Sequence, residues 1–262
     1  MFTVEEITGS SRHFVVELLG KDKLRHAFAY YDLKYDPAHT DMFAAFEDNA
    51  LKGYLLIYHG TEVLSVVLEC EEDAADKLIE HAPRDKFILH TSPSILPAAR
   101  RRYPEAEHYV ESWMVVERGH AKFFHSRLVR RLEVSDAREL ASLLSEREDR
   151  PTGALQQYES MIGHMPLCGV FVDGSLVSYA ASFIQMPELW MIGGVYTHPG
   201  WRNRGYATLA TSAITEEALK SAEKAVLFVR ADNHPAVRAY EKIGYRKIGE
   251  KIWVDVGLGR RP

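Results

Sequence analysis

The chain has 262 residues, 46% hydrophobic and 26% charged, which suits one large or two ordinary domains of a folded, soluble protein. No apolar stretch approaches the ~18 residues of a membrane span, and the acidic, polar start is unlike a secretory signal. The net charge of −5 is uneven, because residues 1–125 carry 14 Lys and Arg against 21 Asp and Glu, whereas residues 126–262 carry 18 against 16. We therefore expect no membrane insertion, no secretion and no nucleic-acid binding, which needs a basic face.

The first half predicts a short series of strands and helices. Residues 53–69 are two β-rich runs around Gly60, which predicts a hairpin. The elements that follow are expected to be a helix over 71–83, a strand over 86–92, a helix over 94–104 and a strand over 108–119.

The second half predicts a longer series of the same kind. A strand over 127–134 is followed by helices over 136–148 and 154–165, the first capped by Ser135 or Asp136. Asp173-Gly174 marks a tight turn between two strands. The remaining elements are a strand over 188–199, a helix over 204–223, a strand over 224–233, a helix over 234–245 and a strand over 246–257. The order β-α-α-β-β-β-α-β-α-β predicts a mixed α/β fold, an α+β mixed sheet.

The two halves align with each other. Pro97-Ala98 falls on Pro235-Ala236, and Gly60 is taken as the equivalent of Gly174. The first copy is then the shorter one, and lacks the strand and the arginine-glycine turn of the second. We predict two related domains, 1–125 and 126–262, the first degenerate. The alternative is that any β-α-β-α series aligns this well.

Cysteine and histidine usage limits the chemistry. Cys70 and Cys168 lie far apart without CxxC spacing, which is typical of free thiols in a reducing cytoplasm. The 12 histidines are scattered, with no HExxH or HxH arrangement beside carboxylates. We expect no metal and a cytoplasmic location.

Arg202, Arg204 and Gly205 stand where the predicted strand over 188–199 runs into a helix. A helix N-terminus exposes backbone N–H groups and partial positive charge, which together attract anions. Gly205 and Ala207 are small enough to leave the approach open, and guanidinium groups bind phosphate. The turn therefore fits a pyrophosphate, although a helix that merely begins near arginines remains the alternative.

Two segments together carry a resemblance to a known family. Val195 to Ala207 reads VYTHPGWRNRGYA, and Asn233 to Tyr245 reads N-x-P-A-x-x-x-Y-x-x-x-G-Y. They resemble the acyl-CoA-binding signature of the GNAT superfamily of acyl-CoA-dependent N-acyltransferases, over residues 126–256. The first half resembles the degenerate N-terminal partner of tandem GNAT proteins. The resemblance implies a GNAT-like fold and acetyl-CoA as co-substrate.

The resemblance also implies roles for individual residues. Backbone groups of Val195 and Thr197, with Tyr196 between them, would hold the pantetheine arm and the acyl carbonyl. The pyrophosphate cradle would consist of Arg202, Asn203, Arg204, Gly205, Tyr206 and Ala207, largely through backbone N–H groups. Asn233, with Ala236 in the same motif, would bind the pantetheine, and Tyr240 would stand near the sulfur as general acid. Asn233 as a helix cap and Tyr240 as a core aromatic are the alternatives.

No general base is evident. Some GNAT members use a glutamate on the fourth strand, but the matching position here is Met191, which accepts no proton. Glu188, three residues earlier, is the catalytic candidate, with Glu159 and His164 behind it. A water chain, or no dedicated base, is equally open.

The function implied is N-acyltransfer, with acetyl as the expected group, to a primary amine of a small molecule or peptide by direct attack in a ternary complex. Glu146, Glu148 and Asp149 are candidates for attracting the amine to a pocket built from residues 146–160 and the 249–254 strand. The alternative is a non-catalytic acyl-CoA sensor. We expect a monomer or homodimer, and no CoA in the first half, where Ile95 and Arg102 replace Asn233 and Tyr240.

Overall fold

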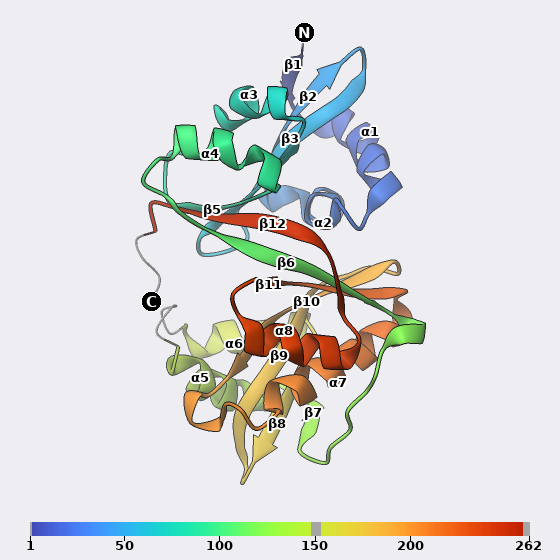
Figure 1. Cartoon of the computed structure of the whole chain (residues 1–262), viewed down its shortest axis with the longest axis vertical. Helices are drawn as coiled ribbons and strands as arrows, with labels where there is room; N and C mark the ends of the chain where they lie inside the picture. The colour runs from blue at the N-terminus through green and yellow to red at the C-terminus, as the bar shows by residue number, and fades with distance from the viewer. Residues whose placement is uncertain (1, 148–152, 259–262) are drawn as a thin grey trace. The chain divides into compact units, whose positions relative to one another are not determined.

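The structure, a computed structural model, describes residues 2–147 and 153–258 in two compact units (Figure 1). The first unit comprises the described residues up to Glu111 together with those from Glu250 onward, and the second comprises Ser112–Gly249. These units divide the chain at other places than the predicted boundary between residues 125 and 126. None of the described helices is both long enough and apolar enough to cross a membrane.

The same order of ten elements occurs twice along the chain. The first series is β1 (Thr3–Glu6), α1 (Gly9–Leu19), α2 (Ala27–Tyr35), β2 (Thr40–Glu47), β3 (Ala50–Tyr58), β4 (Leu64–Cys70), α3 (Ala75–Ile79), β5 (Phe87–Thr91), α4 (Leu96–Arg102) and β6 (Glu107–Glu117). The second is β7 (Val129–Arg131), α5 (Ala137–Ser145), α6 (Leu155–His164), β8 (Leu167–Val172), β9 (Ser175–Gln185), β10 (Leu189–Thr197), α7 (Tyr206–Ser221), β11 (Lys224–Arg230), α8 (His234–Ile243) and β12 (Arg246–Val256). The predicted mixed α/β fold of two related domains is confirmed.

The two series exchange their last strands. In the first unit β5 pairs antiparallel with β12, from Thr91 opposite Ile252 to Phe87 opposite Val256. In the second unit β6 is the neighbour of β11 (Figure 1). The buried side chains show the same exchange. Ile252 and Val254 of β12 are buried in the core of the first unit, whereas Met114 and Val116 of β6 are buried in the core of the second. Hydrophobic burial of these strands is therefore the reason that the units differ from the predicted ranges.

The alignment of Gly60 with Gly174 is wrong. Gly174 lies between β8 and β9, in a turn with φ of 49° at Asp173 and 83° at Gly174. Its counterpart between β2 and β3 is Asp48-Asn49, with φ of 49° and 64°, and positive φ at both positions is typical of a type I′ hairpin. The first series therefore keeps all three strands. It is shortened after β4, where α3 has 5 residues and the equivalent α7 has 16.

The core of the second unit positions α7 and α8. Helix α7 packs on β8, β9 and β10, and buries Ala210, Ile214 and Ala218 in the same cluster as Leu227 of β11. Gly244, with φ of 104°, ends α8 in the left-handed conformation, as the sequence predicts. The core therefore fixes α7 against the sheet, and Gly244 sets the end of α8.

Asp136 does not cap α5 through its side chain, contrary to the prediction. Its carboxylate accepts from the backbone N–H of Glu133 at 2.8 Å and from both terminal nitrogens of Arg130 at 2.6 and 2.7 Å. The hydrogen bonds from Arg130 lower the pKa of this carboxyl below its usual value. Asp136 thus joins β7 to the turn that precedes α5.

Asp136→Asn is expected to lower the free energy of unfolding by about 1–3 kcal/mol at pH 7, because hydrogen bonds to a buried charge are lost. A depressed pKa contributes stability above the unfolded value near ~4, and this contribution disappears as the pH falls through the native value. Denaturant unfolding of wild type and variant should therefore differ at pH 7 and converge at low pH. Glu139→Gln, a substitution of an exposed carboxylate in the first turn of α5, is the control. A gap that persists at low pH would contradict the assignment.

Candidate functional site

The parallel strands β10 and β11 separate part-way along their length. They pair from Leu189 opposite Lys224 to Ile192 opposite Leu227, and no further pair joins their described residues. At this point Gly194 has φ of 62°, and the register of β10 with β9 shifts between Gly193 and Tyr196. Gly194 and Val195 therefore stand together against the single residue Ala180 of β9, and both lie beyond the last pair that joins β10 to β11.

A compact turn leads from β10 to α7. His198 Nδ1 accepts from the backbone N–H of Gly200 at 3.0 Å, and Arg202 Nε donates to the carbonyl oxygen of Thr197 at 3.2 Å. Asn203 and Gly205 have φ of 63° and 81°. Left-handed residues within a turn direct successive N–H groups toward a common side, which is typical of anion-binding concavities.

Six consecutive backbone N–H groups at this turn have no acceptor among the described residues. They belong to residues 203–208, and the first internal hydrogen bond of the helix runs from the Leu209 N–H to the Gly205 carbonyl at 3.0 Å. A Cβ built on Gly205 would meet no atom within 4 Å, so the space beside the turn is open. Unpaired N–H groups and the positive end of the helix dipole together make this a site for an anion.

Aromatic rings hold the arginines of the turn. The guanidinium of Arg202 lies 5.9 Å from the ring centroid of Tyr196, and that of Arg204 lies 4.7 Å from the ring of Trp201. Arg147, which no motif in the sequence marks, lies 5.2 Å from the Tyr196 ring. The Tyr196 hydroxyl donates to the carbonyl of Glu146 at 3.0 Å. Three cationic side chains therefore accompany the free N–H groups.

The second signature segment begins at the same edge of the sheet. Because β10 and β11 are parallel, their carboxyl ends share one edge, and α7 and α8 both start there. Asn233 Oδ1 accepts from the Ala236 N–H at 3.3 Å, so Asn233 caps α8 as its alternative interpretation proposed. The structure thus brings the segments from Val195 to Ala207 and from Asn233 to Ala236 together.

Tyr240 lies further along α8 with its ring in the core. It is 6% exposed, and its ring centroid is 6.1 Å from that of Tyr245. Its hydroxyl oxygen makes no hydrogen bond with the described residues. Burial raises the pKa of this phenol above its usual value, so it keeps its proton at neutral pH.

Comparisons with known proteins agree with this geometry. Residues 168–254 match the family model described as FR47-like protein. A Drosophila protein superposes with a TM-score of 0.73 at 16% identity, over 98% of this chain and 99% of its own. A GCN5-related N-acetyltransferase from Sphaerobacter thermophilus superposes with a TM-score of 0.68 at 14% identity, over 100% of this chain and 96% of its own. A tandem GNAT protein from the clavulanic acid biosynthesis pathway superposes with a TM-score of 0.61 at 12% identity, over 100% of this chain and 100% of its own.

The chain has the tandem GNAT fold. A search of curated protein sequences found no match. The family model spans both signature segments, and these lie in the second GNAT unit.

The GNAT fold does not bring Glu188 to the opening. Glu188 directly precedes β10 at its amino end, whereas Val195 at the opening lies seven residues later, ~23 Å away at ~3.3 Å per residue of strand. Met191, at the position where some family members have a glutamate, is 1% exposed between its neighbours Ile184 and Val226. The structure therefore places neither residue where it would accept a proton from an amine at the opening.

The other predicted acidic and basic candidates lie elsewhere. Glu159 and His164 are exposed on α6, and His164 Nδ1 is 2.7 Å from the carbonyl oxygen of Ser160. Glu148 and Asp149 lie outside the described residues. The 249–254 strand, expected to line the pocket, belongs from Glu250 onward to the first unit, where it pairs with β5.

Ser178 of β9 was not predicted and fixes the end of β10. It is fully buried, donates to the Tyr196 carbonyl at 3.1 Å and lies 2.7 Å from Thr197 Oγ1. Nothing in the sequence pattern marks it, because only the register of β9 with β10 places Ser178 opposite Thr197.

Both cysteines are free thiols. Burial is the main cause that raises the pKa of the Cys70 and Cys168 thiols to about 12. A protonated thiol is a poor nucleophile, so neither is suited to covalent catalysis. In the described part of the chain no three metal-binding side chains gather into a candidate metal site.

The first GNAT unit has no equivalent opening in the described residues. Its parallel strands β4 and β5 pair from Leu64 opposite Phe87 to Leu68 opposite Thr91, the last residue of β5. The helical segment that follows β4 begins among three acids, Glu71, Glu72 and Asp73. Their charge disfavours a phosphate at this position.

Gly205→Ala is expected to lower the free energy of unfolding by about 1 kcal/mol, because a non-glycine residue at φ of 81° is strained. No steric clash adds to this cost, since the space beside Gly205 is open. Gly119→Ala is the matched control, as its Cβ also meets nothing and its φ is not in the left-handed region. Equal stabilities of the two variants in thermal unfolding would contradict the prediction.

Proposed function

We propose that the second unit binds acetyl-CoA and transfers its acyl group to a primary amine. The observation that carries this proposal is the run of six unpaired N–H groups in residues 203–208, at the same sheet edge as the opening between β10 and β11. The GNAT fold supports the assignment to acetyltransferases in general.

Each part of the site suits one part of acetyl-CoA. The free N–H groups, with Arg202 and Arg204, would hold the pyrophosphate. The backbone of Val195 to Thr197, at the opening, would pair with the amide groups of the pantetheine arm. The Asn233 amide would bind the same arm from the start of α8, in addition to its capping hydrogen bond.

The proposed chemistry is direct attack on the thioester. The amine nitrogen forms a bond to the carbonyl carbon, the carbon–sulfur bond breaks, and CoA leaves as a thiolate that takes a proton from Tyr240. The phenolate then regains a proton from solvent, which has received the amine proton. The raised pKa of Tyr240 keeps that proton in place until the thiolate forms. We assign the amine proton to water, because Glu188 precedes β10 at its amino end and the side chain of Met191 accepts no proton. No acyl-enzyme intermediate is needed, and neither thiol is suited to form one.

The second candidate function is an acyl-CoA sensor that binds without turnover. The observation that favours it is the position of Glu188 at the far end of β10. Both candidates use the same anion site, so binding alone does not distinguish them.

Release of free CoA thiol over a panel of small amines, amino acids and peptides separates the two. Thermal shifts with acetyl-CoA and with ATP report binding in parallel. Stabilisation by acetyl-CoA with amine-dependent thiol release is the expected result. Stabilisation without release would favour the sensor, and the absence of both would overturn the proposal.

We further propose that the acceptor is a small molecule or a peptide, and that the protein acts in the cytoplasm as a monomer or homodimer. Two free cysteines suit a reducing compartment. The exposed carboxylate of Glu146 directly follows α5, and its carbonyl contacts Tyr196 near the opening. This supports a positively charged acceptor.

A further inference from the structure

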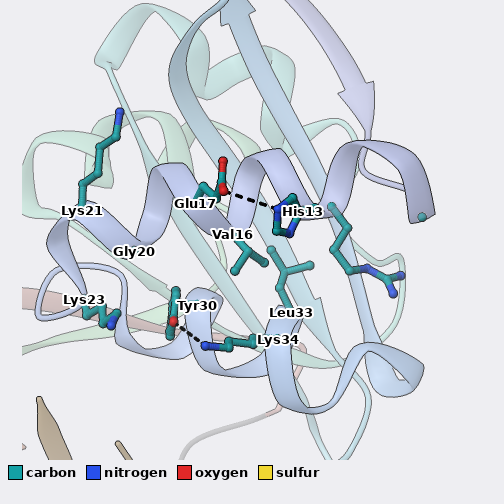
Figure 2. A pocket seen from close by; sticks show the side chains of 11 residues that line it. His13, Val16, Glu17, Gly20, Lys21, Lys23, Tyr30, Leu33 and Lys34 are labelled. Atoms are coloured by element: carbon teal, nitrogen blue, oxygen red, sulfur yellow. Dashed lines mark hydrogen bonds and ion pairs between the residues drawn. The ribbon is translucent and has the colours of Figure 1, made fainter. Parts of the chain in front are cut away.

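A pocket of about 620 Å³ opens in the first unit and is lined by residues of that unit alone. Figure 2 shows side chains that line it from α1, from α2 and from the segment that joins these helices. Val16, Tyr30 and Leu33 contribute its apolar lining. Its volume lies within the ~300–1,000 Å³ typical of small-molecule sites.

The charged lining of this pocket is mostly cationic. Arg12, Lys21, Lys23 and Lys34 face it against a single acid, Glu17. The surrounding sequence has the opposite balance, since residues 1–125 carry 14 basic and 21 acidic residues. Concentrated positive charge in an acidic unit creates a local field that attracts anions.

The acid in the lining is already engaged. Glu17 Oε1 lies 3.3 Å from Nε2 of His13, one turn earlier on α1, as Figure 2 shows. Lys34 donates to the hydroxyl of Tyr30 at 2.8 Å, a neutral partner that leaves its charge uncompensated. Neither Lys34 nor Lys21 is buried, so both ammonium groups remain accessible to a ligand.

Arg12 supplies a donor that lacks an acceptor. Its Nε is buried and has no hydrogen-bond partner among the described residues. A buried N–H without an acceptor is costly. Arg12 is half-buried as a whole and adds its guanidinium charge to the lining of the pocket.

We infer that this pocket binds a small organic anion that carries two or more phosphate groups. More than one is inferred because the cations occupy separate places, with Arg12 on α1, Lys21 after it and Lys34 on α2. Ammonium and guanidinium groups are the usual partners of phosphate. A long polyanion such as nucleic acid is disfavoured by the acidity of the rest of the unit. This inference is independent of the proposed acyl transfer.

Isothermal titration calorimetry of the full chain with pyrophosphate, fructose 1,6-bisphosphate and inositol hexakisphosphate tests it. At least one probe should bind the wild type, and Lys21→Glu combined with Lys34→Glu should weaken it at least tenfold. Arg84→Glu with Lys86→Glu is the matched control, because both side chains are exposed in the same unit and outside the pocket. That pair should change the affinity by less than twofold.

Two further arms locate the ligand. Arg202→Ala with Arg204→Ala removes cations of the other anion site, which would itself bind pyrophosphate, so only the part of the probe binding that depends on Lys21 and Lys34 should persist unchanged in this variant. Lys21→Gln with Lys34→Gln gives a milder loss without charge reversal, and circular dichroism checks that each variant is folded. The inference is overturned if no probe binds, if the control pair loses as much affinity as the pocket pair, or if only the Arg202 and Arg204 variant loses it.

Discussion

Tyr240→Phe is expected to lower kcat for acyl transfer at least a hundredfold while the affinity for acetyl-CoA stays within about twofold of wild type. General acid catalysis contributes ~10²–10⁴ to a rate, and this phenol is the acid that we assign to the departing thiolate. Its hydroxyl has no partner among the described residues, so removal of the oxygen breaks no internal hydrogen bond. Thiol-release kinetics and calorimetry measure the two quantities separately.

The neighbouring Tyr245→Phe is the matched control. The Tyr245 hydroxyl lies 2.9 Å from Thr215 Oγ1, so its removal is expected to cost about 1 kcal/mol of stability and to leave turnover unchanged. If Tyr240→Phe turned over acetyl-CoA as fast as wild type, the assignment of the acid would be wrong. Equal loss in both variants would indicate disturbed packing instead of a lost proton donor.

Ala207→Glu is expected to weaken acetyl-CoA binding roughly a hundredfold, or by about 2.7 kcal/mol. The new carboxylate stands in the first turn of α7, beside the N–H groups assigned to the pyrophosphate, and repels it. A negative charge in the first turn of a helix is otherwise stabilising, so the unliganded protein should unfold at the same or a slightly higher temperature. Loss of acetyl-CoA binding with unchanged thermal stability would show that the substitution disrupts the binding site and not the fold.

Ala207→Gln has nearly the same size as Ala207→Glu without the charge. It should weaken binding less than the glutamate does, by the steric part alone. Equal effects of the two substitutions would show that bulk and not charge is responsible. Unchanged binding in both would place the pyrophosphate elsewhere.

Local sequence signals were sufficient for the element order of the second unit. Asp173-Gly174 predicts its hairpin, and Gly244 predicts the end of α8, because positive φ at these positions restricts the residue type. The turn before α7 was predicted on the same ground, and Gly205 has φ of 81°. These features depend on a few consecutive residues, which is the range over which a single sequence is informative.

Features that depend on pairing between distant strands were not predicted. The exchange of β6 and β12 was not predicted, because the pattern within a strand does not state which distant strand it pairs with. The Gly60 alignment failed because Asn49 takes the left-handed position that glycine occupies in the second copy. Ser178 and Glu188 required the register and the direction of β10, which no local motif encodes.

Hydrogen–deuterium exchange of the full chain with and without acetyl-CoA tests the central claim most directly. The N–H groups of residues 203–208 have no described acceptor, so they should exchange rapidly in the free protein. Acetyl-CoA should slow exchange over residues 193–209 and at the start of α8, and leave residues 64–79 of the first unit unchanged. Unaltered exchange at residues 203–208, or protection confined to the first unit, would contradict the account.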